Sequence, residues 1–216
     1  MNAAFVCQME AVLDWYAQPL DEQQPVVCVD ERPCQLLGDT RQAQLMRPGT
    51  PKRVDHEYAR HGMANLFLAV QPRAGWRQLS VTARRTKADF AHFLKQLADD
   101  QFPTADCIHL VVDNLNIHTP AVLYDTFPAS EARRLARRFM FHYTPKHASW
   151  LNMAEIELSV FARSLRRRVA SATELAWAAA HFQCVRNRDH ACIQWHFTVD
   201  DARCALARLY PSPSQR

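Results

Sequence analysis

Several absences narrow the classes of protein that this sequence can encode. No run of about 18 apolar residues occurs, which excludes a membrane-spanning helix and predicts a protein with no membrane partner. The first five residues lack the basic-then-apolar order of a signal peptide, so we expect a cytoplasmic protein. None of the seven cysteines forms a Cys-x-x-Cys pair, which argues against a zinc ribbon or a redox motif. Their odd number fits free thiols in a reducing compartment.

Lysine and arginine are also absent from the N-terminal part of the chain, where none precedes Arg32. By contrast, residues 130–170 hold nine basic residues against three acidic ones, a net charge of +6, although the whole chain carries only +4. A smaller basic cluster lies earlier in the chain, at Arg84, Arg85 and Lys87. Such a concentration of positive charge favours a polyanionic partner such as nucleic acid, and it is equally compatible with a solvated helix face.

The composition is that of a globular protein. Of the 216 residues, 48% are hydrophobic and 22% are charged, which argues against wholesale disorder. A chain of this length can bury a core without disulfides or a structural metal. Because no repeat or low-complexity linker divides it, we expect one domain over residues 25–210, with a helical arm at 1–24 and a frayed tail at 211–216.

The spacing of apolar residues predicts an alternation of strands and helices. We expect strands over residues 25–30, 64–70, 76–83, 108–112 and 138–143. We expect helices over residues 3–16, 87–100, 119–126, 131–138, 149–169, 172–187 and 198–209. Thr86, Ser130 and Thr198 are the expected N-caps of three of them. Residues 32–63 are rich in proline and glycine and are expected to form a long loop, with one extended piece around 35–37.

This order of elements predicts an α/β fold. Two strands form a hairpin, and strands then alternate with helices, which implies a mixed sheet with helices on its faces. Two of the strands read as buried and each ends in an acid, Asp30 in one case and Asp113 in the other. Carboxylates at the ends of such strands lie in the crevice where open α/β sheets hold their ligands.

A third acid, Glu155, is expected on the helix that follows the last strand, so three elements can direct carboxylates to one point. Oxygen ligands of this kind suit Mg²⁺, with Mn²⁺ as a substitute. Two such ions about 4 Å apart can activate a water and stabilise the leaving oxygen of a phosphodiester.

Two stretches resemble motifs of insertion-sequence transposases in the mariner superfamily. Asp113-Asn-Leu-Asn-Ile-His118 resembles their D-N-x-x-x-H motif. The stretch from His142 to Glu155 resembles their longer tyrosine, proline, leucine-asparagine and glutamate motif, and the strand over 27–31 matches their first acidic motif. The resemblance implies an RNase H-like fold, a mixed sheet flanked by helices, and a D-D-E triad that binds the metal. Residue by residue, the triad falls on Asp30, Asp113 and Glu155.

Two acids compete with members of that triad. Glu157 lies two residues beyond Glu155, and periodicity does not choose between them, whereas the resemblance selects Glu155. Glu31 adjoins Asp30, and because side chains alternate along a strand the two are expected to point to opposite sides. The resemblance selects Asp30.

The neighbours of the triad are expected to support the metal ligands or to contact DNA. This group comprises Asn114, His118, Lys146, His147 and Asn152. His118 is a possible general base and equally a hydrogen-bonded structural residue. The residues expected to neutralise the DNA backbone are Arg84, Arg85, Arg163, Arg166, Arg167 and Arg168.

These residues together predict a transposase catalytic domain. The expected reaction is metal-dependent hydrolysis of DNA phosphodiesters at the element ends, followed by transfer of the exposed 3′-hydroxyl into target DNA. The expected partners are double-stranded DNA, both as ends and as target, and a second copy of the chain in a homodimer or synaptic complex. The alternatives are an RNase H-like nuclease or resolvase, and a truncated remnant that only binds DNA or oligomerises.

One departure from the family concerns recognition of the DNA ends. The family carries N-terminal helix-turn-helix modules for this purpose, and only about 25 residues precede the first strand here, too few for one module and a linker. We therefore expect either a catalytic fragment or the product of a truncated reading frame.

Overall fold

The computed structural model describes residues 3–41, 48–49, 56–165 and 167–211. Within them a single five-stranded sheet has the order β3-β2-β1-β4-β5. The strands are β1 (Val26–Asp39), β2 (Tyr58–Gln71), β3 (Trp76–Thr82), β4 (Ile108–Val112) and β5 (Phe139–Tyr143). The first three are paired antiparallel, and β4 and β5 join them in parallel, so the sheet is mixed as predicted.

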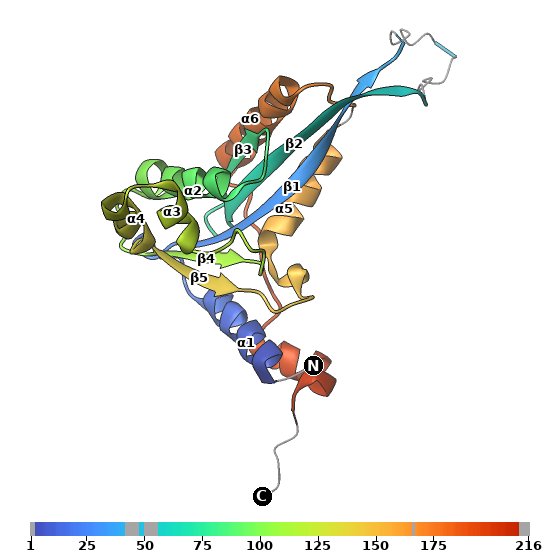
Figure 1. The fold of residues 1–216 in the computed structure, drawn as a ribbon. Coiled ribbons are helices and arrows are strands. Elements are labelled where there is room, and N and C mark those ends of the chain that lie inside the picture. The colour runs from blue at the N-terminus through green and yellow to red at the C-terminus, as the bar shows by residue number, and fades with distance from the viewer. Residues whose placement is uncertain (1–2, 42–47, 50–55, 166, 212–216) are drawn as a thin grey trace, which may run out of the picture.

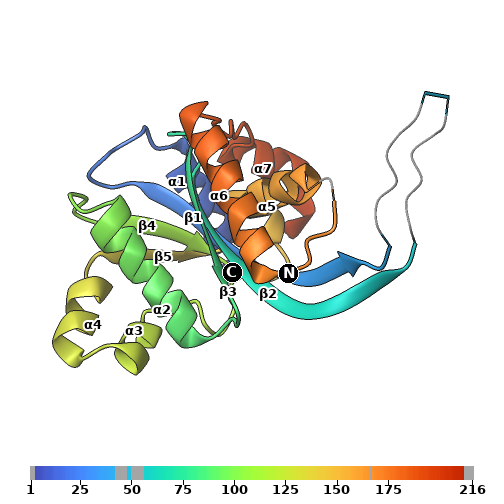
Figure 2. The same cartoon turned by 90° about the horizontal axis from the view of Figure 1, so that it is seen from above.

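Helices cover both faces of this sheet (Figures 1 and 2). One face carries α2 (Lys87–Gln96), α3 (Ala121–Thr126) and α4 (Ala129–Ala136), and the other carries α1 (Ala3–Ala17), α5 (Met153–Ser164), α6 (Ala172–Arg188) and α7 (Val199–Ala205). Each face has its own core, because alternate strand residues point to opposite sides. Val27 and Val29 of β1 belong to the core under α2–α4, whereas Cys28 belongs to the core under α5.

The strands β1 and β2 are much longer than predicted, and the long loop expected over residues 32–63 is wrong. Glu31 to Asp39 pair residue by residue with Phe67 to Tyr58, with one irregularity between Gln35 and Leu37. The pairing of one strand with the other outweighs the local turn preference of proline and glycine here. The described part of this hairpin extends beyond the other strands (Figure 1). The middle of the expected loop, residues 42–47 and 50–55, lies outside the described residues.

The helix expected over residues 149–169 is also revised. A 3-10 turn, η2 (Ser149–Leu151), precedes α5, which Asn152 caps and which ends at Ser164. Residues 167–171 are not helical, and in this segment the Val169 carbonyl accepts from the Leu37 N–H of β1 at 2.8 Å.

The remaining elements fall close to their predicted bounds. The N-caps expected at Thr86 and Thr198 are present, and each forms a capping box, with Asp89 and Asp201 as the reciprocal partners. Ser130 is not an N-cap, since α4 already begins at Ala129 after Pro128. Two short turns complete the list, a π-helical turn η1 (Leu97–Gln101) after α2 and a 3-10 turn η3 (Ala207–Leu209) after α7.

The two ends of the described chain lie on the same side of the sheet as α5. The buried residues of α1, which include Met9, Leu13 and Tyr16, join the core beneath α5 and α6. Arg203 of α7 pairs with Glu10 of α1 at 2.9 Å. The predicted boundaries of the arm and the catalytic domain stay predictions, and most of the predicted tail lies outside the described residues. No helix in the described parts of the chain is long and apolar enough to cross a membrane.

Candidate active site

Asp30 and Asp113 lie at corresponding positions of two neighbouring parallel strands, Asp30 within β1 and Asp113 directly after β4. The register of β1 with β4 runs from Val26 opposite His109 to Cys28 opposite Val111, so both acids lie two residues beyond the last pair. Because side chains alternate along a strand, Asp30 shares the face of Cys28, which belongs to the core under α5. Asp113 follows the end of its strand, and its charge acts on Asp30.

The two acids differ in their backbone setting. Asp113 begins the loop that follows β4, as predicted, whereas Asp30 lies inside β1, which continues to Asp39. The prediction that Asp30 ends its strand is therefore wrong. Asp30 instead marks the point where the parallel neighbour of β1 ends, which opens the sheet beside it.

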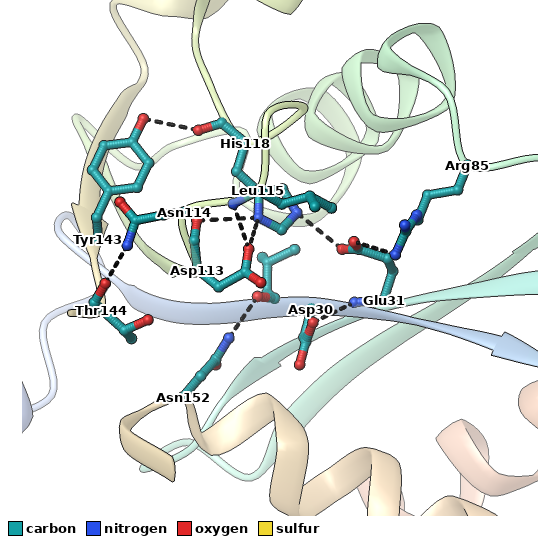
Figure 3. Close-up of polar contacts among 11 residues, drawn as sticks. Asp30, Glu31, Arg85, Asp113, Asn114, Leu115, His118, Tyr143, Thr144 and Asn152 are labelled. Carbon is teal, nitrogen blue, oxygen red and sulfur yellow. Dashed lines mark hydrogen bonds and ion pairs between the residues drawn. The ribbon is translucent and has the colours of Figure 1, made fainter. Parts of the chain in front are cut away.

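Glu155 lies in the first turn of α5, and Asn152 fixes the start of that helix against β1. The Asn152 side-chain oxygen accepts from the Ala154 N–H at 3.1 Å, and its amide donates to the Val29 carbonyl at 2.9 Å (Figure 3). This second bond ties the helix to the residue before Asp30. Asn152 is only 1% exposed, so it supports the site from within.

The electrostatics of Asp30 show that the acidic side chains share one region. The pKa of Asp30 is raised to about 7, chiefly by burial and also by the nearby charges of Glu31, Asp113 and Glu155, against the lowering effect of the Glu31 N–H that donates to its carboxylate. Asp30 thus lies in a concentration of negative charge that a cation would relieve.

The donor set fits a hard divalent cation by its chemistry. Carboxylates on three different elements are the ligands that Mg²⁺ and Mn²⁺ accept, and the crowded charge at Asp30 favours a cation there. Within the described ranges, no three His, Cys, Asp or Glu side chains lie close enough together to hold a metal ion. The charges of the carboxylates therefore act on one another, but the described side chains do not form a preformed metal site.

Asp113 is the first of four side chains that contact one another in series. His118 Nδ1 lies 2.6 Å from Asp113 Oδ1, and His118 Nε2 lies 2.9 Å from Glu31 Oε2 (Figure 3). Arg85 then donates to Glu31 Oε1 at 3.2 Å. Burial lowers the pKa of His118, but the hydrogen bonds to Asp113 and Glu31 outweigh it and raise that pKa to about 9. In turn, the hydrogen bond from His118 is the main cause that lowers the pKa of Asp113.

Glu31 is a functional candidate that the sequence left only as a rival to Asp30. Its side chain lies on the α2 side of the sheet, where it holds His118. The alternation of side chains already predicted that the two acids point to opposite sides, and the structure confirms it. What alternation did not supply is the partner, because His118 lies 87 residues along the chain.

Burial distinguishes Glu155 from Glu157. Glu157 is completely buried and pairs with Arg77 and Arg186, whereas Glu155 is only half-buried. Of the two, only Glu155 has access to solvent beside Asp30.

The other predicted neighbours of the triad lie in the loops that follow β4 and β5. The Asn114 amide donates to the Thr144 carbonyl and so joins these two loops, and the Tyr143 hydroxyl donates to the His118 carbonyl at 2.8 Å. Lys146 and His147 are both exposed in the loop before η2, and His147 adopts a positive φ of 67°.

The arginines predicted to contact DNA are dispersed. Arg84, Arg163 and Arg167 are exposed, and Arg85 is held by Glu31. Arg168 pairs with Asp39 at 2.8 Å. Since α5 ends at Ser164, Arg167 and Arg168 do not extend along the helix of Glu155, and Arg166 lies outside the described residues.

Comparison with known proteins identifies the type of domain. A family model described as "DDE superfamily endonuclease" matches residues 25–176, a stretch that contains Asp30, Asp113 and Glu155. No match is found among curated proteins.

Solved structures resemble the fold at low sequence identity. The Mos1 strand transfer complex matches over 94% of this chain with a TM-score of 0.58 and 14% identity. The mariner Mos1 paired end complex with Mg matches over 96% of it with a TM-score of 0.54 and 17% identity. This chain covers 60% and 63% of those two chains respectively. The likeness confirms the predicted RNase H-like fold, a mixed sheet flanked by helices.

Proposed function

The chain belongs to the DDE superfamily endonucleases, and from that premise we propose that it is the catalytic domain of a DNA transposase. The proposed reaction is hydrolysis of a DNA phosphodiester at an element end, followed by attack of the new 3′-hydroxyl on target DNA. The observation that carries the proposal is that Asp30 and Asp113 each lie two residues beyond the last pair of two parallel strands, and that the charges of Asp113 and Glu155 both act on Asp30.

Asp30, Asp113 and Glu155 are the residues that would hold Mg²⁺, or Mn²⁺ in its place. When bound, such ions lower the pKa of the attacking water or hydroxyl and stabilise the leaving oxygen. Asp30 supports this assignment, because a carboxyl with a pKa raised to about 7 by burial and neighbouring acids gains most from a nearby cation.

His118 and Asn152 would keep these ligands in place. His118 holds one oxygen of Asp113, so the other oxygen remains directed away from that bond. Asn152 joins the start of α5 to β1 next to Asp30. Groups that orient metal ligands in this way contribute to metal affinity even though they do not touch the ion.

Double-stranded DNA is the proposed partner, as element end and as target. The exposed Arg84, Lys146, Arg163 and Arg167 are candidates for backbone contacts, which position a duplex without reading its sequence. The solved chains of similar fold are described as strand transfer and paired end complexes, which supports a homodimer or synaptic complex. A DNA-acting domain of this kind would work in the cytoplasm.

Nicking of supercoiled plasmid in Mn²⁺ tests the proposal. We expect Asp113→Asn to lose at least 100-fold of the nicking rate, because a neutral amide replaces a charged metal ligand. The exposed acid Asp189, which pairs with Arg188 next to it, offers the matched control Asp189→Asn, which should keep wild-type activity. Full nicking by Asp113→Asn would show that the triad is assigned wrongly.

Joining of a labelled 3′-hydroxyl oligonucleotide to the plasmid tests the second half of the reaction. A transposase produces covalent joint molecules, whereas a nuclease or resolvase on the same scaffold only cuts. A chain that binds DNA but neither cuts nor joins it in Mn²⁺ would be a remnant without catalytic activity.

A further inference from the structure

Behind the candidate active site, a buried cluster of charged residues joins α5 to β3 and α6. Glu157 of α5 and Arg77 of β3 are both 0% exposed, and Arg77 Nε lies 2.9 Å from Glu157 Oε1. This contact is an ion pair. Arg186 of α6 donates to both oxygens of the same carboxylate, at 2.5 and 2.9 Å. One carboxylate therefore serves two guanidinium groups.

Hydrogen bonds from Arg77 and Asn187 connect this cluster to the backbone. Arg77 donates to the Gly75 carbonyl at 2.8 Å and to the Ala191 carbonyl at 2.5 Å. Asn187, next to Arg186, exchanges two hydrogen bonds of 2.8 Å with the backbone of Arg77. These contacts join β3, α6 and the segment after α6 to Glu157 of α5.

Glu157 lies two residues from Glu155. Successive residues of an α-helix are about 100° apart, so Glu155 and Glu157 point in directions about 200° apart around the axis. A carboxylate held inward at Glu157 therefore sets the rotation of α5 that directs Glu155 outward, towards Asp30. Ion pairs with two planar guanidinium groups specify that rotation more narrowly than apolar packing does.

We propose that Glu157, with Arg77 and Arg186, positions Glu155 for metal binding, an inference that rests on the proposed function. Arg186, Asn187 and Ala191 lie beyond residue 176, where the match to the family model ends. The C-terminal part of the chain would then be required for the active site although it supplies none of the metal ligands.

The test compares Glu157→Gln and Arg186→Lys with the wild type by three measurements: Mn²⁺ binding by electron paramagnetic resonance, plasmid nicking, and amide hydrogen exchange over residues 153–157. We expect about tenfold weaker Mn²⁺ binding, about tenfold slower nicking at saturating DNA and faster exchange, with the Kd for DNA changed less than twofold. A loss of about tenfold or more is typical when a group that orients a metal ligand is removed. Arg186→Lys keeps the charge and serves as the milder variant if Glu157→Gln does not fold.

Leu135→Ala is the matched control, because Leu135 is fully buried in the core on the opposite face, under α2–α4. It loses stability without touching α5, so it should keep Mn²⁺ affinity and nicking at temperatures where it is folded. Losses in Arg186→Lys no larger than in this control, or wild-type values for all three measurements, would overturn the positioning role. If the wild type itself neither binds Mn²⁺ nor nicks DNA, the proposed function fails, and unchanged exchange over residues 153–157 in the variants would then overturn the positioning role separately.

Discussion

At the scale of single residues, adjacent acids perform different tasks because a strand turns alternate side chains to opposite faces. Asp30 faces α5 and its neighbouring acids, whereas Glu31 faces α2 and holds His118 at 2.9 Å. Glu155 and Glu157 likewise point to different sides of α5, because successive residues of a helix are rotated by about 100°. In both pairs one acid lies at the site and the other supports it from the protein interior.

The role of Glu31 gives a prediction at this scale. Replacing it by glutamine keeps its shape but removes the charge that holds His118, so Asp113 loses a fixed partner. We expect Glu31→Gln to lower the rate of Mn²⁺-dependent nicking about 10- to 100-fold, with unchanged DNA affinity.

The exposed acid Asp125, which pairs with Lys87, supplies the control Asp125→Asn, and this variant should nick DNA at the wild-type rate. A Glu31→Gln chain with a wild-type rate would mean that the contact with His118 has no part in the reaction.

At the scale of elements, the start of α5 depends on one side chain. Asn152 caps the helix and also donates to the Val29 carbonyl, so a single residue sets both where the helix begins and which strand residue it meets. The long motif that resembles the family runs across this junction, from β5 through η2 into α5.

We expect Asn152→Ala to lower the free energy of unfolding by about 1–3 kcal/mol, because it removes an N-cap and leaves a buried carbonyl unpaired. Urea unfolding would measure this loss. Asn152→Asp is the informative partner variant, since aspartate still caps the helix but cannot donate to Val29. If Asn152→Asp matched the wild type both in stability and in nicking, the bond to β1 would be unimportant.

At the scale of the whole molecule, helix α1 packs against strands β4 and β5 through a cluster of aromatic and imidazole rings. Trp15 of α1 stacks on His109 of β4, with ring centroids 3.7 Å apart, and lies 4.8 Å from His142 of β5. The two histidines are 2.9 Å apart through Nδ1 and Nε2. Burial, and then the charge of His109, lower the pKa of His142 to about 4.

This pair predicts a loss of stability in acid. A histidine whose folded pKa lies below its unfolded value of about 6.5 stabilises the fold fully above that value, and the contribution is lost as the pH falls towards 4. We expect the free energy of unfolding of the wild type to fall by about 2 kcal/mol more than that of His142→Gln between pH 7 and pH 4.5, as measured in urea.

The comparison with His142→Gln is needed because Asp30 acts in the opposite direction. Its pKa is raised above the unfolded value, so acid relieves the cost of its buried charge. His181 is exposed, and His181→Gln should therefore keep the wild-type dependence on pH. Equal losses in the wild type and in His142→Gln would exclude the pair as the cause.

Much of the local structure could be predicted because it depends on neighbouring residues. The bounds of β4, the N-caps at Thr86 and Thr198, and the hairpin of β2 and β3 all follow from short-range patterns that tertiary contacts did not override. Asp30, Asp113 and Glu155 were inferred from their places after two strands and on a helix, the family resemblance selected them over Glu31 and Glu157, and the assignment stays a proposal.

What the sequence by itself determined is therefore where chemistry-bearing residues lie along the chain and which side of a strand or helix each occupies. Tertiary structure alone decided that β1 continues past Asp30, that α5 ends at Ser164, that Glu31 meets His118 and that Glu157 meets Arg77 and Arg186. The reason is physical: each of these outcomes depends on partners far away in the chain. Periodicity describes one element at a time and carries no information about which distant element will satisfy a buried charge or an unpaired strand edge.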